Sequence, residues 1–206
     1  TINPKTIKKG DIVFLKTELK EIFFSEFHKR ISNKYILISH NSDMSISKND
    51  LTFIDQNIIH WFAMKLNVEM NEKISPLPSG LENYRYFSNG IVRNFDEAYK
   101  LNQKIEKSNN ILCSFNASTN KTEREPLLEI AKTSEKIDIR NFSDNKDYLI
   151  NLSTYKYNLC PEGNDFESHR IWETLFFNNY PIVKNNLVNL NFVNPGIPLI
   201  MVRSWD

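Results

Sequence analysis

The stretch that decides the fold is CPEGNDFESHRIWETLFFNNYPIVKNN, residues 160–186. Its Pro-Glu-Gly-Asn-Asp sequence is typical of a turn, and the residues that follow have helical spacing, which predicts a helix over 166–179. A short apolar strand is expected directly after that helix, at 181–185, and another directly before the turn, at 156–162. Strand, helix and strand in this order form a βαβ unit, which builds a parallel sheet.

The alternation of strands and helices continues on both sides of this stretch. In the second half of the chain, strands are expected at 110–116, 136–142 and 197–205, and helices at 94–107, 122–134 and 147–155. In the first half, strands are expected at 11–16, at 34–43 and from residue 73, and helices at 19–31 and 58–66. The pattern therefore predicts an α/β fold with a smaller α/β domain at 1–93 and, at 94–206, a Rossmann-like domain with a doubly wound parallel sheet.

Two helices of the first half rest on periodicity alone. In the helix expected at 19–31, Ile22, Phe23, Phe27 and Ile31 recur at helical spacing, which places them on one side. Residues 51–66 mix the strand and helix periods, and we interpret them as a short strand or turn that leads into a helix at 58–66.

The composition argues against several classes of function. The 206 residues carry a formal net charge of +1 and their cations are dispersed, which argues against a nucleic acid or an anionic membrane as the partner. Two cysteines, Cys113 and Cys160, lie in apolar runs and are expected to be buried free thiols in a reducing compartment. No apolar run is long enough for a membrane span, and the first residues are not typical of a signal peptide, so we expect a cytoplasmic protein.

An arginine in the first turn of the helix expected at 166–179 indicates a function. The helix dipole disfavours Arg170 at this position unless an anion lies between its guanidinium and the free amides of the helix N-terminus. Asn164 is expected to cap the helix, with Glu167 in a capping-box relation to it. Glu173 follows Arg170 by one turn and has the chemistry to accept hydrogen bonds from a ribose diol. Together these residues indicate a site for a nucleoside diphosphate.

Each of these assignments has a structural alternative that the sequence leaves open. Arg170 and Glu173 also fit an ordinary surface ion-pair ladder with the carboxylate that precedes them by one turn. Asn164 also serves as a helix cap without any ligand, and Lys121 and Arg124 also serve as solvated cations at the start of a helix. The chain contains neither GxGxxG nor GxxxxGK[ST], so the common dinucleotide and P-loop fingerprints are absent from it.

The segment YKYNLCPEGNDFESHRIWETLFFNNYPIV, residues 155–183, resembles the donor-site segment of exostosin-like glycosyltransferases. The shared pattern is a Tyr-Lys strand, Pro-x-Gly-Asn, His-Arg-x-Trp-Glu and a short strand with Pro-Ile-Val. A more distant similarity is to the α1,3-fucosyltransferases. Weaker matches run through most of the chain in the expected order: KKGDIVFLKTE, YILISHNSD, WFAMKLNVEMNEKISPLPSGLEN and CSFNASTNKTER. FFNNYPIV departs from the pattern, with Asn-Asn where a small residue and glycine are usual, and the chain stops after MVRSWD, where such folds continue into a helix.

The resemblance implies a GT-B architecture, in which two Rossmann-like domains face each other across a cleft and the C-terminal domain binds a nucleotide-sugar donor. It implies that Arg170 binds the donor phosphates and Glu173 the ribose. It places further donor contacts in the loop after the strand at 156–162 and at the adjacent strand end: Glu162, Gly163, Asn164, Arg124, Lys121 and Asn116. His169, beside Arg170, is a further candidate contact to the donor sugar.

The implied activity is transfer of a sugar to a glycan or another hydroxyl acceptor, in polysaccharide or glycoconjugate synthesis. No Asp-x-Asp sequence occurs in the chain, so we expect metal-independent, inverting transfer with no metal site and no cofactor besides the donor. An inverting reaction needs a general base, and Asp43 or His40, at the end of the strand at 34–43, is expected to face the donor. The alternative is that Asp43 caps the next segment and His40 is merely packed. His60 is expected to be structural.

Two other functions stay open. One is a catalytically inactive nucleotide-sugar-binding or scaffold domain of a larger glycan-synthesis protein, and a chain that begins without Met is compatible with a piece of a longer protein. The other is a different Rossmann-type enzyme, such as an epimerase or methyltransferase. The lack of a glycine-rich first loop argues against the second.

Overall fold

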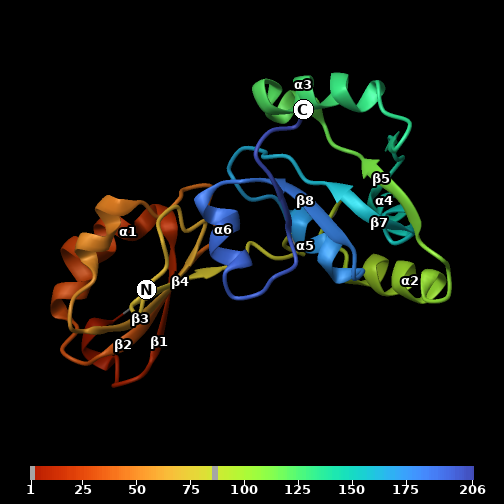
Figure 1. The fold of residues 1–206 in the computed structure, drawn as a ribbon. Helices are drawn as coiled ribbons and strands as arrows, with labels where there is room; N and C mark the ends of the chain where they lie inside the picture. The colour runs from red at the N-terminus through yellow and green to blue at the C-terminus, as the bar shows by residue number, and fades with distance from the viewer. Residues whose placement is uncertain (1–2, 85–87) are drawn as a thin grey trace. The chain divides into compact units, whose positions relative to one another are not determined.

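The computed structural model describes residues 3–84 and 88–206 (Figure 1). The chain divides into two compact units, which are described separately below. Unit 1 consists of Thr1–Ser79 and Leu190–Pro195, and unit 2 of Gly80–Asn189 and Gly196–Asp206. The sequence suggested a boundary after residue 93, whereas the contacts of the chain place unit 2 from Gly80 onward.

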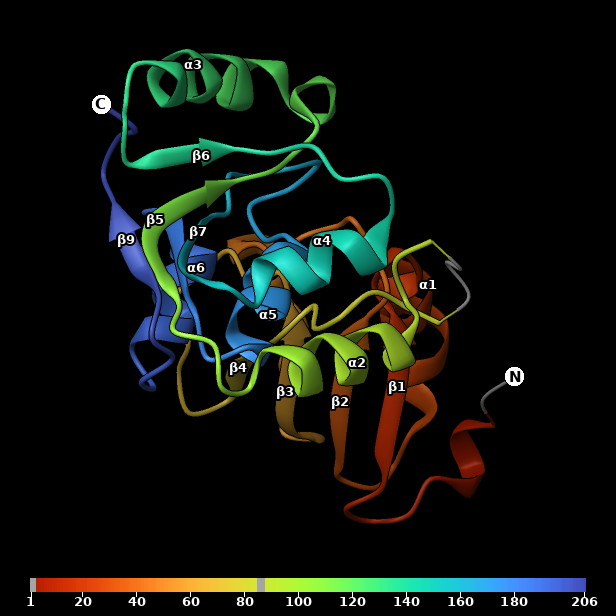
Figure 2. The ribbon, with the colours of Figure 1, turned by 90° about the vertical axis from the view of Figure 1, so that its right-hand side faces the viewer.

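Unit 1 is built on a four-stranded parallel sheet. Its strands are β1 (Ile12–Lys16), β2 (Tyr35–His40), β3 (Ile58–Met64) and β4 (Ile74–Leu77). They lie in the order β1-β2-β3-β4, and every neighbouring pair is parallel (Figure 2). Val13, Leu37 and Trp61 project from three of these strands into one buried cluster. The sheet thus has one face in the core of the unit.

The segment after β1 is helical throughout but irregular. A 3-10 turn (Thr17–Leu19) is followed by α1 (Lys20–Ile22), a π-turn (Phe23–Phe27) and another 3-10 turn (His28–Arg30). The wider π-turn shifts the phase of the apolar side, so Phe23 and Phe24 are both buried whereas Ile22 is 57% exposed. The helical nature of the segment is confirmed, but Ile22 is not buried with Phe23, the residue that the helical spacing grouped it with.

The prediction of a helix at 58–66 is also wrong, because residues Ile58–Met64 form the strand β3. The strand pairs with β2 on one side and with β4 on the other, so its backbone groups are satisfied within the sheet. Trp61 is fully buried, and its Nε1 donates a hydrogen bond of 2.8 Å to Ser39 Oγ on β2. A short, continuously apolar run fits a buried strand as well as a buried helix, and here sheet pairing decides between them.

Unit 2 is built on a five-stranded parallel sheet with the order β6-β5-β7-β8-β9. Its strands are β5 (Ser108–Cys113), β6 (Ile137–Ile139), β7 (Tyr155–Leu159), β8 (Tyr180–Lys184) and β9 (Ile200–Val202). Its helices are α2 (Val92–Asn102), α3 (Lys121–Lys132), α4 (Asn145–Leu152) and α5 (His169–Phe176). A further helix, α6 (Leu187–Val193), was not expected from the sequence, and its residues from Leu190 onward belong to unit 1. An α/β fold with parallel sheets is thereby confirmed.

The chain reverses its direction across this sheet once, between β5 and β7. It passes from β5 outward to β6, then crosses back to β7 on the other side of β5 and continues to β8 and β9. Cys113 of β5 packs with Leu127 of α3, and the adjacent Leu112 packs in a separate cluster with Phe95 of α2 and Leu149 of α4. Figure 2 accordingly shows α3 on one side of β5 and β6 and α4 on the other. Helices therefore cover both faces, as in Rossmann-like sheets.

A helix that crosses a bilayer needs about 20 predominantly apolar residues. Within residues 3–84 and 88–206, no helix is both long enough and apolar enough to span a membrane.

Candidate functional site

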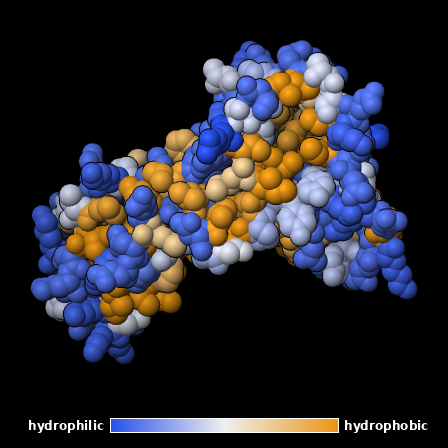
Figure 3. All heavy atoms as spheres, viewed as in Figure 1, coloured by the Kyte–Doolittle hydropathy of each residue, from blue (hydrophilic) through white to orange (hydrophobic). Residues whose placement is uncertain are grey.

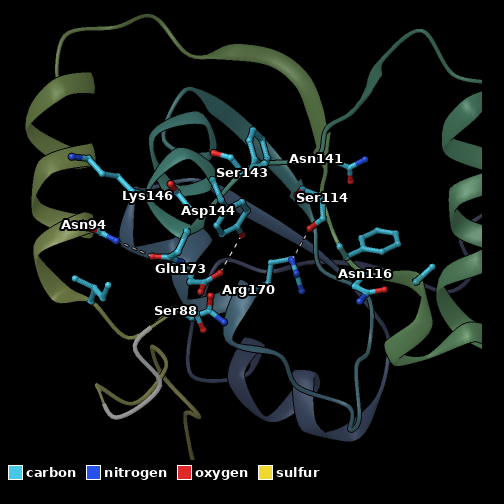
Figure 4. Close-up of a pocket in the computed structure, with 17 residues that line it drawn as sticks. Ser88, Asn94, Ser114, Asn116, Asn141, Ser143, Asp144, Lys146, Arg170 and Glu173 are labelled. Carbon is cyan, nitrogen blue, oxygen red and sulfur yellow. Dashed lines mark hydrogen bonds between the residues drawn. The ribbon is translucent and has the colours of Figure 1, made fainter.

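A pocket of about 990 Å³ lies at the point where the strand order of unit 2 reverses. Its walls come from residues 88–94, the segments after β5 and β6, and the helices α4 and α5. Most of the lining side chains are polar (Figure 4): Ser88, Asn89, Asn94, Ser114, Asn116, Asn141, Ser143, Asp144, Asn145, Lys146, Tyr148, Arg170 and Glu173. In parallel sheets, the carboxyl ends of the strands at such a switch point form the usual ligand crevice.

Arg170 lies in the first turn of α5, as predicted, and lines the pocket. Its Nε donates a hydrogen bond of 2.9 Å to the backbone carbonyl of Ser114, at the end of β5 (Figure 4). Within the described part of the chain, its two terminal amino groups have no hydrogen-bond partner. Arg170 thus offers a free, oriented pair of donors of the kind that binds phosphate oxygens.

The cap predicted for this helix is wrong. Helix α5 begins at His169, and its N-cap residue is Ser168, whose side chain makes no capping hydrogen bond. Glu167 does not complete a capping box, because its Oε1 accepts a hydrogen bond from Trp172 Nε1. Asn164 lies in the exposed loop before the helix. The later start of the helix places Arg170 nearer the N-terminal amides than the predicted boundaries did.

Glu173 is the buried carboxylate of the pocket. Its side chain lies one turn beyond Arg170, and its Oε2 accepts a hydrogen bond of 3.1 Å from the Tyr148 hydroxyl of α4. Burial raises the pKa of Glu173, while the positive charge of Arg170 acts in the opposite direction. Its Oε1 has no hydrogen-bond partner among the described residues and remains available to a ligand hydroxyl. This geometry does not correspond to an exposed ion-pair ladder.

Arg124 and Asn116 are in contact near the end of β5, but only Asn116 lines the pocket. Asn116 lines the pocket, and its Oδ1 accepts hydrogen bonds from the backbone amide and hydroxyl of Ser118. Arg124 is buried behind it and donates to two backbone carbonyls, those of Asn116 and Glu162, each at 2.8 Å. Arg124 is therefore not a solvated cation, and its side chain does not line the pocket.

The loop after β7 holds the next three residues that the resemblance implies. The Glu162 carboxylate accepts a hydrogen bond from Asn186 Nδ2 at 2.9 Å, and burial raises its pKa. The Gly163 carbonyl accepts one from Asn120 Nδ2 at 3.0 Å. Neither of these two residues lines the pocket, and neither does Asn164.

His169 and Lys121 complete the implied donor contacts, and neither lines the pocket. His169 Nδ1 lies 2.7 Å from the Gly80 carbonyl, and its Nε2 lies 3.4 Å from Glu82 Oε2. Both ring nitrogens are thus engaged by the segment that opens unit 2. Lys121 is exposed at the first position of α3.

The two candidate bases lie in unit 1, at and just beyond the end of β2. Asp43 is 81% exposed, and its Oδ1 forms an ion pair of 3.0 Å with Lys65 Nζ. His40 Nε2 lies 2.9 Å from the carbonyl of Pro78, which holds the ring in place. The ring nitrogens of His60 lie near the Glu72 carbonyl and the Ser75 hydroxyl, in agreement with a structural role. A role of Asp43 or His40 toward an acceptor stays a prediction.

The chain matches no protein-family model and no curated protein. Residues 3–84 and 88–206 also contain no group of three or more His, Cys, Asp or Glu side chains arranged to hold a metal ion. The case for a function therefore depends on the geometry of unit 2.

Sequence reasoning missed the residues that α4 and the preceding loop bring to the pocket. Tyr148, Asn141 and Ser143 belong to a polar run that directly follows the strand β6. A polar cluster after an apolar strand was the signal that marked the loops after β5 and β7, and the same signal applied to residues 140–146 would have found this wall.

Proposed function

We propose that the chain is a glycosyltransferase of the GT-B type that uses a nucleotide-sugar donor. The observation that carries the proposal is the arrangement of Arg170 and Glu173 one turn apart in the switch-point pocket. The terminal amino groups of Arg170 have no partner among the described residues, and the Glu173 carboxylate is buried. A guanidinium suits a diphosphate, and a carboxylate suits the hydroxyls of a ribose. The resemblance of residues 155–183 to the donor segment of exostosin-like glycosyltransferases supports the same assignment.

The size and polarity of the pocket support a large polar ligand. A volume of about 990 Å³ lies at the upper end of the range of ligand pockets, ~300–1,000 Å³. Its lining is rich in amides and hydroxyls, which hydrogen-bond to the heteroatoms of a nucleotide sugar, whereas an apolar ligand would leave them unpaired. A lipid or an apolar cofactor fits this lining poorly.

In the proposed reaction, an acceptor hydroxyl attacks the anomeric carbon of the donor sugar from the face opposite the diphosphate. The bond between that carbon and the β-phosphate oxygen breaks, and the nucleoside diphosphate leaves with the bonding electron pair. Arg170 and the amides at the start of α5 stabilise the charge that develops on the leaving group. The acceptor proton passes to a general base, for which Asp43 or His40 is the candidate.

A thermal-shift panel of UDP-, GDP- and TDP-sugars tests the proposal first. A ligand at 100 times its dissociation constant should stabilise the folded protein by about 2.7 kcal/mol. Sugar transfer or donor hydrolysis is then measured with and without EDTA, and we expect both rates to survive the chelator. Binding without turnover would favour a catalytically inactive nucleotide-sugar-binding module, and no binding to any member of the panel would reject the donor site.

A further inference from the structure

The guanidinium of Arg124 donates to two backbone carbonyls, whereas the terminal amino groups of Arg170 have no hydrogen-bond partner among the described residues. Arg124 Nε donates to the carbonyl of Glu162, and its Nη1 donates to the carbonyl of Asn116. The first carbonyl lies in the segment after β7 and the second in the segment after β5, and these two strands are neighbours in the sheet. One planar side chain therefore joins the exits of both strands at the switch point.

The packing around Arg124 encloses the guanidinium on its remaining sides. Its Cζ lies 5.5 Å from the centre of the Phe115 ring. A Cβ at position 163 would lie 3.0 Å from Arg124 Nη2, so the absence of a side chain at Gly163 lets the loop approach this closely. Asn120 Nδ2 donates to the Gly163 carbonyl and ties the same loop to the start of α3 a second time.

The segment that Arg124 contacts is also bound by a second arginine. Arg170 Nε donates to the carbonyl of Ser114, two residues before the carbonyl that Arg124 binds. Ser114 and Asn116 both line the pocket, so the position of this wall depends on two arginines from two different helices. Arg170 faces the pocket as well, whereas Arg124 does not.

We propose that Arg124 is a positioning residue that fastens the loop after β7 to the end of β5, and that it does not bind the donor phosphates itself. The inference rests on the proposed function for the identity of the ligand. It differs from the phosphate contact that the resemblance implies for Arg124. It also explains why a cation is buried in the wall of a pocket without lining it.

The chemistry of the side chain fits this role. Burial, together with the nearby charge of Arg170, lowers the pKa of Arg124 to about 10, so the side chain is still protonated at neutral pH. A charged donor makes stronger hydrogen bonds to carbonyls than a neutral one. The fixed fork of a guanidinium reaches two carbonyls at once, whereas the single ammonium group of lysine on its flexible stem does not reproduce that geometry.

The first test is hydrogen exchange of the ligand-free protein, because it needs no nucleotide. We expect Arg124→Gln and Arg124→Lys to speed exchange at least tenfold in peptides covering both 114–120 and 160–166. Lys132→Gln removes an exposed cation from the same helix and should leave both segments unchanged. If the Arg124 variants do not fold, Gly163→Ala should speed exchange in both segments to a smaller extent, because its Cβ would lie 3.0 Å from Nη2 and shift the guanidinium slightly while the charge stays. Unchanged exchange in either segment would overturn the clamp.

The second test separates positioning from phosphate contact, and uses calorimetry with UDP and GDP. We expect Arg124→Gln and Arg124→Lys to weaken binding alike, at least tenfold, with the ionic-strength dependence of wild type. Arg170→Ala should reduce that dependence. If Arg124→Lys binds nucleotide as tightly as wild type and Arg124→Gln shows reduced salt dependence, Arg124 contacts the phosphate directly and the positioning role is rejected. Unchanged affinity in both variants would also reject the positioning role. If wild type binds neither UDP nor GDP and no sugar of the thermal-shift panel, the proposed function fails, and the exchange data alone decide whether Arg124 is a clamp.

Discussion

The two parallel sheets of this chain differ in how the chain crosses them. In unit 1 the order β1-β2-β3-β4 always advances in one direction, and right-handed crossovers then place every connection on the same face. The connections after β1 and β2 do pack on one cluster with Val13, Leu37 and Trp61. On the other face, Ile12 is 64% exposed and Phe14 is 52% exposed. Figure 3 shows such apolar side chains at the surface of this unit.

The sheet of unit 2 reverses once and gains two things from that reversal. Helices cover both of its faces, since α3 lies on one side and α2 and α4 on the other. The reversal also separates the connections after β5 and β7, and the pocket with Arg170 and Glu173 lies there. The position of the pocket thus follows from strand order, because two parallel sheets of similar size differ in whether they possess a switch point.

The largest expected effect is a loss of stability when a buried side chain of the unit 2 sheet is truncated, compared with an exposed one of the unit 1 sheet. Leu112→Ala, at a fully buried position of β5, should cost unit 2 about 2–5 kcal/mol of stability. Phe14→Ala, on the open face of β1, should cost unit 1 under about 1 kcal/mol, because roughly half of that ring is already in water. Hydrogen exchange in β7 and β2 reports each unit separately. Equal costs would show that the open face of unit 1 is covered in solution.

The next prediction asks whether the two units divide the chemistry. Asp43→Asn keeps the shape of the side chain and removes its basicity, so it should lower turnover roughly 100-fold while nucleotide affinity stays the same. The control is His40→Ala, which should have the smaller effect if Asp43 is the base. Near-normal turnover in both variants would remove unit 1 from proton transfer.

The smallest expected effect is the loss of stability that results from burying the Glu173 carboxylate in the pocket. Burial raises the pKa of Glu173 above its unfolded value, so the folded state loses stability as pH rises from the unfolded pKa through the folded one. Glu173→Gln removes that loss. We expect the variant to be more stable than wild type at pH 7, with the gain vanishing below the unfolded pKa of ~4.3. Thermal unfolding at the two pH values measures it, and a variant that is less stable at pH 7 would contradict a desolvated carboxylate.

The sequence predicted the fold best where one periodicity dominates. The strands and helices of unit 2 from β5 to β8 lie within a few residues of their predicted places, because apolar runs and turn residues alternate there. The strand β3 was mistaken for a helix because its apolar run carries neither period clearly. The helix α6 was missed because its buried side mixes Val188 and Phe192 with buried asparagines, Asn189 and Asn191.

The candidate site was predictable only in its local part. The sequence indicates Arg170 and Glu173 because the helix dipole disfavours a cation in the first turn unless an anion binds there. Tyr148 could not be paired with Glu173, because the contact between α4 and α5 depends on how both helices pack on the sheet. Likewise, the spacing of residues in the sequence could not predict that Arg124 binds two backbone carbonyls and is not exposed to solvent.

The measurement that tests the central claim most directly is the affinity of Arg170→Ala for UDP and GDP by titration calorimetry. Arg203→Ala removes an exposed cation of the same unit and serves as the matched control. Losing a charge-assisted contact to phosphate should weaken binding by ~2 kcal/mol, roughly 30-fold, while the control binds as wild type does. Unchanged affinity in Arg170→Ala, with the fold intact by circular dichroism, would contradict a nucleoside diphosphate site at the switch point.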